Sequence, residues 1–257
     1  HLGDSVQKSY EEIERLMKEI VEQQNERRKS ELAVLQSQIN PHFLYNTLES
    51  ITWMIEGNRN QDAVFMISEL AQLFRISLSR GKTIIRIGDE LQHCRNYMNI
   101  QKYRYRERFV TEYDVSEEIY PFCTVKLILQ PILENAIYYG VGDMDEDDHP
   151  RILVRGFKKD EDIYLMVSDN GMGMRREDVE NILTDNQKVP KHGSGVGLIN
   201  VHTRIQLMFG VRYGLTVESE PDEGTTVTIH LPAIPYTKEN CEILEAQGKP
   251  PRNEVES

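Results

Sequence analysis

The sequence predicts a helical hairpin followed by an α+β sandwich with a mixed sheet. Two amphipathic helical patterns separated by the turn composition of residues 57–60 predict the hairpin, and two such hairpins from two chains would form a four-helix bundle. After residue 83, strand and helix patterns follow one another without regular βαβ alternation, which is typical of an α+β fold with helices on one face of the sheet. The 257 residues suffice for one or two domains with a substantial core.

Four parts are expected along the chain. Residues 1–35 form a signalling or coiled-coil helix, residues 36–82 the dimerisation hairpin, residues 83–235 a second domain, and residues 236–257 a loose polar tail.

The first helix, residues 5–35, carries two apolar sets with coiled-coil spacing that are out of phase: Ile13, Leu16 and Ile20, then Leu32, Leu35 and Ile39. One interpretation is a solvated helix. The other is a parallel dimer helix that transmits a signal and can yield at the phase break.

Pro41 is the irregular residue of the hairpin. Either Asn40 caps a new helix with Pro41 at its first position, or one long helix kinks there. Apolar periodicity on both sides favours the kink. The apolar face of the following helix is predicted to hold Ala63, Met66, Ile67, Leu70, Leu73 and Phe74.

The second domain is predicted from alternation, helical periodicity and turn residues. The expected elements are a short strand 83–87, a helix 89–107, a strand 109–115, a helix 125–139, a loop 142–150, strands 152–157 and 163–168, a helix 175–183, a loop 184–197, a helix to residue 209, and a hairpin of strands 213–219 and 225–231.

Composition excludes several classes of function. The net charge of −12 and the lack of a basic stripe argue against nucleic acid as a partner. Three widely spaced cysteines argue against a disulfide framework or a zinc site, and for a reducing compartment. No apolar run approaches the roughly 18 residues of a membrane span. Because the chain begins with His1 rather than methionine, we expect a piece of a longer protein.

Three segments of the second domain predict one nucleotide site. They are Glu134-Asn135-Ala136 on a helix, Asp169 to Gly173 after a strand, and Gly193 to Leu198 at the opening of a helix. Each glycine pair alone fits a simple turn as well. Three pieces in this order within one α+β domain are more specific.

The chemistry of these segments suits a nucleotide with a metal ion. Asp169 can accept a hydrogen bond from an exocyclic amine, and Gly171 and Gly173 would let the backbone approach a planar ligand. The helix opening near Gly195 offers free N–H groups for phosphate, and Asn135 offers a neutral oxygen to Mg²⁺. The segment does not fit the dinucleotide-binding fingerprint, because Leu198 stands where that motif needs its third glycine. It does not fit a P-loop either, because no Gly-Lys-Ser/Thr follows.

These motifs resemble those of the LytS/YesM-type sensor histidine kinases, over about residues 36–232. Residues 38–46, Gln-Ile-Asn-Pro-His-Phe-Leu-Tyr-Asn, resemble the phosphoacceptor motif of that family. Residues 130–136, Gln-Pro-Ile-Leu-Glu-Asn-Ala, resemble its N box, residues 169–173 its first glycine box and residues 193–197 its second.

The resemblance implies a Bergerat-type (GHKL) ATP domain and a phosphoacceptor at His42. It implies Asn135 on Mg²⁺, Asp169 on adenine and a mobile ATP lid over residues 184–197. Further ATP contacts are implied at Gly171, Gly173, Gly193, Gly195, Gly197 and Leu198. The protein would be a homodimer that passes phosphate to a response regulator, and this chain would be the cytoplasmic portion of a bacterial membrane protein.

Two features bear on activity. Tyr138 and Tyr139 stand where the family usually has lysine and histidine, and tyrosine cannot neutralise phosphate at pH 7. Phe43 follows the acceptor, which leaves the general base open; Glu49, two turns on along the same face, is a candidate. Arg204 matches the Asn-Val-x-x-Arg pattern of the family and is expected to hold the helix after the lid.

The other histidines compete poorly as acceptors, because they fall in elements or loops of the ATP domain or at the chain start. Two alternatives remain open. One is an inactive dimeric scaffold that binds nucleotide or a regulator, motivated by the two tyrosines. The other is a non-kinase ATPase of the same class, such as the type II topoisomerases or chaperones, against which the His42 hairpin argues.

Overall fold

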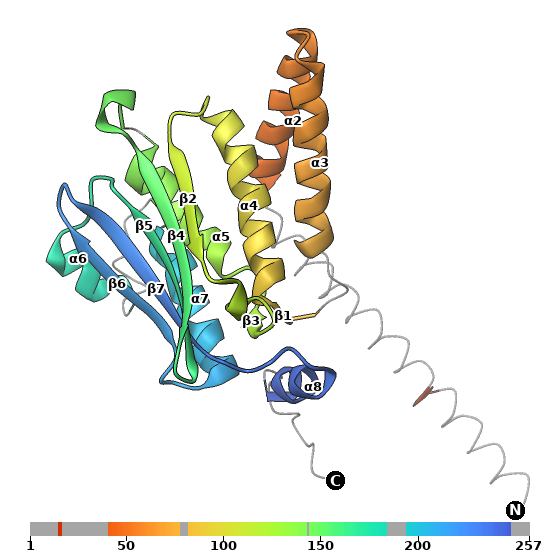
Figure 1. Cartoon of the computed structure of the whole chain (residues 1–257), viewed down its shortest axis with the longest axis vertical. Helices are drawn as coiled ribbons and strands as arrows, with labels where there is room; N and C mark the ends of the chain where they lie inside the picture. The colour runs from red at the N-terminus through yellow and green to blue at the C-terminus, as the bar shows by residue number, and fades with distance from the viewer. Residues whose placement is uncertain (1–14, 17–40, 78–81, 143, 184–193, 248–257) are drawn as a thin grey trace, which may run out of the picture. The chain divides into compact units, whose positions relative to one another are not determined.

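The structure is a computed structural model that describes residues 15–16, 41–77, 82–142, 144–183 and 194–247 (Figure 1). The chain forms two compact units, residues 1–50 and 51–257. Some predictions lie outside the described residues: most of the helix 5–35 and its two registers, Asn40 and with it the choice between cap and kink, Gly193, and most of the loop 184–197. No helix in the described ranges is long and apolar enough to cross a membrane.

Two helices joined by a short turn occupy the region of the predicted hairpin. They are α2 (Pro41–Glu56) and α3 (Asn60–Ser77). The turn closes where the Arg59 N–H donates to the Met54 carbonyl at 2.7 Å, and Asn58 takes a φ of 57°, which asparagine tolerates. Most of the predicted apolar face of α3 is buried, but Ile67 is 51% exposed.

Five strands form the mixed sheet that the sequence predicts. In sheet order they are β2 (Val110–Val115), β4 (Arg151–Lys159), β5 (Asp162–Asp169), β7 (Gly224–Pro232) and β6 (Gly214–Glu220). Strand β2 runs parallel to β4, and the other neighbours are antiparallel. A separate antiparallel ladder joins β1 (Ile84–Arg86) to β3 (Cys123–Val125).

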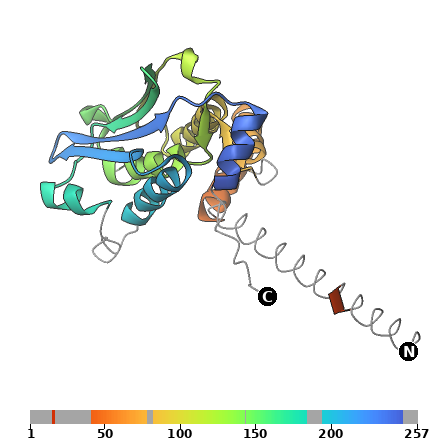
Figure 2. The same ribbon diagram turned by 90° about the horizontal axis from the view of Figure 1, so that it is seen from below.

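One face of the sheet is covered by α4 (Ile87–Arg104), α5 (Leu129–Asn135) and α7 (Ser194–Phe209) (Figures 1 and 2). Along β5, Ile163, Leu165 and Val167 are buried while their neighbours are partly exposed, so alternate side chains form the core with the helices. Shorter helical pieces are Glu117–Ile119, Glu146–Asp148 and α6 (Arg176–Asn181). The α+β sandwich is confirmed.

The helix predicted for residues 125–139 begins later than predicted. Val125 pairs with Ile84 in the β1–β3 ladder, and Leu127 has a φ of 58°, which a right-handed helix cannot accommodate. Helix α5 therefore begins at Leu129, with Pro131 in its first turn, where a missing N–H costs little. After Asn135 the chain continues as a π-helical turn, Ala136–Val141.

Two further boundaries differ from the prediction. Helix α7 begins at Ser194, so residues 194–197 form its first turn rather than a loop. Part of the expected loose tail is a helix, α8 (Lys238–Gln247), which packs against α7 and β1 and buries Leu244. The Thr237 hydroxyl accepts the Asn240 N–H at 3.2 Å, as an N-cap does, and this short polar helix has few apolar residues to reveal it.

Candidate nucleotide site and phosphoacceptor histidine

The N box ends in an unusual helical turn. Asn135 is half-buried at the end of α5, and the Gly142 N–H donates to the Ile137 carbonyl at 2.7 Å, five residues back, as in a π-helix. Such turns are rare and often mark functional sites. Tyr138 and Tyr139 lie in this turn and are 43% and 45% exposed.

The N box and the first glycine box are in direct contact. A Cβ added to Gly171 would lie 2.4 Å from the backbone of Gly140, and one added to Gly140 would lie 2.7 Å from the Asp169 carboxyl carbon. Both glycines are therefore required by the close approach of two chain segments. The backbone of Gly140 thus gives a reason for glycine at position 171 that lies within the chain.

Gly173 also serves a contact within the chain. It has a φ of 63°, and a Cβ there would lie 1.9 Å from the carbonyl oxygen of Glu220. The Asp222 N–H donates to the Met172 carbonyl at 2.8 Å, so the turn between β6 and β7 holds this end of the glycine box. The box is thus fixed on both sides, by the N box and by the β6–β7 turn.

Asp169 is a half-buried carboxylate at the end of β5. One of its oxygens, Oδ1, accepts the Gly171 N–H at 3.0 Å. Burial raises the pKa of Asp169 to about 6, although hydrogen bonds from the Gly171 and Thr225 backbone lower it. A carboxylate with few donors around it can accept a hydrogen bond from an amine of a ligand.

The second glycine cluster opens α7 beside α5. Gly195 and Gly197 lie in the first turn of α7, whose N–H groups have no partners within the helix. A Cβ on Gly197 would lie 3.5 Å from the Pro131 side chain, which places this turn next to the N box helix. The Leu198 side chain is only 2% exposed and belongs to the core.

His42 lies on α2 with its side chain exposed to solvent. The Asn46 amide nitrogen, one turn later, is 3.1 Å from Nε2 and 3.4 Å from Nδ1 of the imidazole. Glu49 is also exposed on this helix. The phosphoacceptor candidate therefore has in Asn46 a neighbour that can fix its ring, and its side chain is exposed to a reaction partner.

Together, Asn135, Asp169 and the start of α7 supply a neutral oxygen, a carboxylate and free N–H groups. This donor set fits an adenine nucleotide, whose amine and phosphates need an acceptor and donors respectively. Within the described residues, no group of three His, Cys, Asp or Glu side chains could hold a metal. A metal here would rely on few protein ligands, as Mg²⁺ does when it is bound with phosphates.

Comparisons with known proteins agree with these features. Residues 30–109 match the family described as histidine kinase, and residues 124–235 match the family described as histidine kinase-, DNA gyrase B- and HSP90-like ATPase. The chain belongs to the histidine kinases. Its second domain, as a member of this ATPase family, is an ATP-binding domain.

Three relatives illustrate the extent of the similarity. The chain is 39% identical to sensor histidine kinase YesM of Bacillus subtilis over 86% of its length and 36% of the relative. It is 31% identical to BtsS of Escherichia coli K12 over 79% of its length and 33% of the relative. For LytS of Streptococcus mutans the values are 30%, 85% and 37%. The chain thus spans about a third of the length of these relatives.

Other histidines of this kinase segment have structural partners. His93 is fully buried on α4 and lies 2.9 Å from the Ser77 hydroxyl. His202 Nδ1 on α7 accepts the Leu215 N–H at 2.9 Å, and His230 on β7 lies 3.0 Å from Asp162. Their placement in elements of the ATP domain confirms the sequence prediction.

Two residues beside the predicted site were assigned no role from sequence. Glu134 precedes Asn135, and its carboxylate accepts the Gln130 amide N–H at 2.8 Å; burial raises its pKa. Asn170 follows Asp169 and bridges two neighbouring residues, accepting the Arg151 N–H at 2.7 Å and donating to the His149 carbonyl at 3.1 Å. Both stood in the quoted motifs. Gln130 lies one helical turn before Glu134, whereas the partners of Asn170 lie 19 and 21 residues away in sequence.

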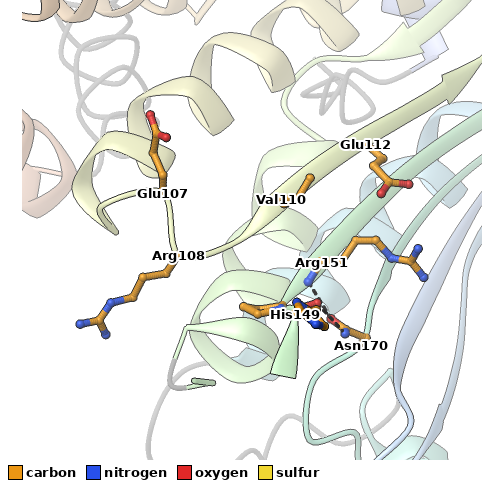
Figure 3. Close-up of a pocket in the computed structure, with 8 residues that line it drawn as sticks. Glu107, Arg108, Val110, Glu112, His149, Arg151 and Asn170 are labelled. Atoms are coloured by element: carbon orange, nitrogen blue, oxygen red, sulfur yellow. Dashed lines mark hydrogen bonds between the residues drawn. The ribbon is translucent and has the colours of Figure 1, made fainter. Parts of the chain in front are cut away.

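A cleft of about 600 Å³ is lined in part by Asn170 (Figure 3). Its lining residues are Glu107, Arg108, Val110, Glu112, His149, Pro150, Arg151 and Asn170. Of the three predicted nucleotide segments, the glycine box contributes one lining residue, Asn170. The cleft and the candidate nucleotide site therefore meet at the end of β5, where the glycine box begins.

Proposed function

We propose that this chain is the kinase segment of a sensor histidine kinase of a two-component system. It would transfer the γ-phosphoryl group of ATP to His42 and then to an aspartate of a response regulator. The observation that carries the proposal is the contact of the N box with the first glycine box at Gly140 and Gly171, beside the start of α7. In the same chain, an exposed histidine stands in a phosphoacceptor motif.

The roles of the site residues follow from their chemistry. Asp169 accepts the adenine amine, and the N–H groups at the start of α7 face the phosphates, with Gly193, Gly195 and Gly197 keeping that approach open. Asn135 supplies an oxygen to Mg²⁺, which offsets charge on the phosphate oxygens. Residues 184–197 would serve as the ATP lid, as the family resemblance implies.

The chemical step is a direct displacement. A nitrogen of neutral His42 attacks the γ-phosphorus in line, the bond to the ADP oxygen breaks, and the imidazole loses its remaining proton to a base. Imidazole suits this role because it is largely neutral near pH 7 and keeps a nucleophilic nitrogen. Asn46 can hold the ring by a hydrogen bond to one nitrogen. Glu49 is the candidate base.

The proposed assembly is a homodimer within a membrane-anchored sensor, with this segment on the cytoplasmic side. Large apolar side chains exposed along α2 and α3 support a second copy as the partner: Tyr45, Leu48, Trp53, Ile55, Val64, Phe65 and Ile67. A four-helix bundle of two such hairpins would bury them. A shift of the segment before Pro41, which the sequence predicts as a helix, would then regulate access of the ATP domain to His42.

The test is incubation with γ-labelled ATP and Mg²⁺, comparing wild type with His42→Gln and Asn135→Ala. We expect acid-labile, alkali-stable label in the wild type only. His42→Gln should still bind nucleotide, because residue 42 is not part of the proposed nucleotide site. Hydrolysis of ATP that persists in His42→Gln without a phosphoprotein would instead indicate a plain ATPase.

A second candidate function is a nucleotide-binding scaffold without kinase activity. The exposed tyrosines of the π-helical turn favour it, since they carry no positive charge where phosphate would bind. Nucleotide binding without label in the wild type would support the scaffold. Tyr138→Lys with Tyr139→His should then restore label.

A further inference from the structure

Three of the four residues that lead into the N box, Lys126 to Leu129, are held by one buried carboxylate. Glu90 on α4 is fully buried. Its Oε2 accepts the Leu127 N–H at 2.8 Å, and its Oε1 accepts the Ile128 and Leu129 N–H groups at 2.8 and 2.9 Å. These N–H groups lie before or at the start of α5 and have no helical partners, so the carboxylate replaces the water that they would otherwise bind.

The carbonyls of the same segment are bound from α7. The Arg204 guanidinium donates to the Lys126 carbonyl at 2.6 Å and to the Leu127 carbonyl at 3.4 Å. Arg204 thereby holds α7 in place, as its motif predicts. Burial raises the pKa of Glu90, whereas the three N–H groups and Arg204 lower it. A buried carboxylate with this many donors is a fixed acceptor rather than a mobile surface charge.

The Lys126 side chain joins this segment to the end of α3. Its ammonium donates to the Ser77 carbonyl at 2.8 Å, and Lys126 is 4% exposed. The Ser77 hydroxyl lies 2.9 Å from His93, one turn after Glu90 on α4. Elsewhere, α3 packs along α4, with the Asn99 amide donating to Glu69 at 2.9 Å. Lys126 thus links the last described turn of α3 directly to the segment that leads into the N box.

We propose that Glu90 is a positioning residue for the nucleotide site, and that Lys126 couples this position to the end of α3. Glu90 fixes where α5 begins and therefore where Asn135, at its other end, is presented. A displacement of α3 would pull on Lys126 and shift the segment that Glu90 holds. The proposal rests on the function proposed above for Asn135, and it adds a route from the helical hairpin to the ATP domain.

The first test compares Glu90→Gln with Glu69→Gln in the nucleotide-free protein. Both remove a buried carboxylate, but Glu69 accepts its hydrogen bond from Asn99 on α4, whereas Glu90 accepts three from residues 127–129. In Glu90→Gln, one of the two accepting oxygens becomes an NH₂ group. At least one backbone N–H that is bound in the wild type would therefore lose its acceptor. Hydrogen exchange of residues 127–135 should rise about tenfold or more in Glu90→Gln only, with strand β5 unchanged.

The second test measures the dissociation constant of a non-hydrolysable ATP analogue. We expect it to rise about tenfold in Glu90→Gln and to stay at the wild-type value in Glu69→Gln. Equal exchange and equal affinity in Glu90→Gln and wild type would overturn the positioning role. If the wild type binds no nucleotide, the proposed function fails, while the exchange measurement still tests the positioning of α5.

Lys126→Met tests the coupling to α3. Exchange should rise both in the last turn of α3 and in residues 127–135, because both lose the same link. A rise confined to α3 would show that Lys126 holds only that helix and would refute the coupling. If Glu90→Gln does not fold, Arg204→Lys serves in its place, because it keeps the charge but loses the planar group that reaches two carbonyls.

Discussion

The helices α2 and α3 expose large apolar side chains, whereas charged side chains are buried where α4 meets the segment before the N box. Trp53, Val64 and Ile67 are 65%, 67% and 51% exposed, while Glu90 and Lys126 are 0% and 4% exposed. Isolated exposed apolar residues are ordinary, but several on two helices require another surface to bury them. The buried charges already have their partners within the chain. Burial of the apolar side chains of α2 and α3 is therefore expected to depend on protein concentration. The contacts around Glu90 and Lys126 are expected to be independent of it.

The largest effect is expected on nucleotide affinity, at the candidate nucleotide site, whose residues all belong to one chain. Asp169→Asn should weaken binding of an ATP analogue about a hundredfold, because a charged acceptor for the adenine amine becomes a neutral amide. Isothermal calorimetry measures this loss of affinity. Repeating it at a second protein concentration tests whether the loss is independent of dimerisation, as we expect. Glu112→Gln, at an exposed carboxylate on β2, is the control and should bind as wild type does.

The pH dependence sharpens this prediction. Burial raises the pKa of Asp169 from 3.8 to about 6, so the folded chain binds its proton more tightly than the unfolded chain. The stability that this group contributes is fully present below the unfolded value and is lost as the pH rises through about 6. Nucleotide affinity should depend on pH in the opposite direction: it should weaken below about pH 6, because the Asp169 carboxylate that accepts the hydrogen bond becomes protonated. Comparing the pH dependence of affinity in wild type and Asp169→Asn cancels the contribution of the nucleotide phosphates, which titrate in both. Equal pH profiles of affinity in the two proteins would contradict the role of Asp169 as the acceptor.

An intermediate effect is expected for the exposed apolar side chains. Val64→Lys with Ile67→Lys should raise the dimer dissociation constant about tenfold to a hundredfold, because each change removes apolar area from the proposed bundle and adds a charge. Light scattering over a range of protein concentrations measures it. Gln61→Lys, exposed on the same helix, adds charge without removing apolar area. A double variant that associates as the Gln61→Lys control does would place the dimer contact elsewhere.

Periodicity made most of this fold predictable. Strands such as β4 and β5 alternate between buried and more exposed side chains along most of their length, and the helix α3 repeats its buried residues at helical spacing. The order of the three nucleotide motifs was equally visible, because each lies within a few consecutive residues. Local patterns of this kind survive in the sequence, whichever elements they later contact.

The rest depended on contacts between distant residues. The apolar run from Val125 fits a strand or a helix, and the choice is made by pairing with Ile84 and by the Glu90 carboxylate, more than thirty residues away. The reason for Gly171 is the backbone of Gly140, which no spacing rule connects to it. Helix α8 was missed because it is mostly polar and gains its place by burying Leu244.

The smallest effect distinguishes close packing from backbone strain at the edge of the nucleotide site. Gly173 and Gly210 both have positive φ, 63° and 100°, but a Cβ at Gly210 would meet nothing within 4 Å, whereas one at Gly173 would lie 1.9 Å from the Glu220 carbonyl oxygen. Gly210→Ala should lower the free energy of unfolding by about 1 to 2 kcal/mol through strain alone. Gly173→Ala should cost about 1 to 3 kcal/mol more, because the β6–β7 turn must move. Denaturant unfolding measures both changes. Because that turn contacts the glycine box, Gly173→Ala should also weaken ATP-analogue binding, and we expect the dimer dissociation constant to stay unchanged. Equal losses of stability in the two variants would show that the turn yields freely and that the glycine box is not fixed from that side.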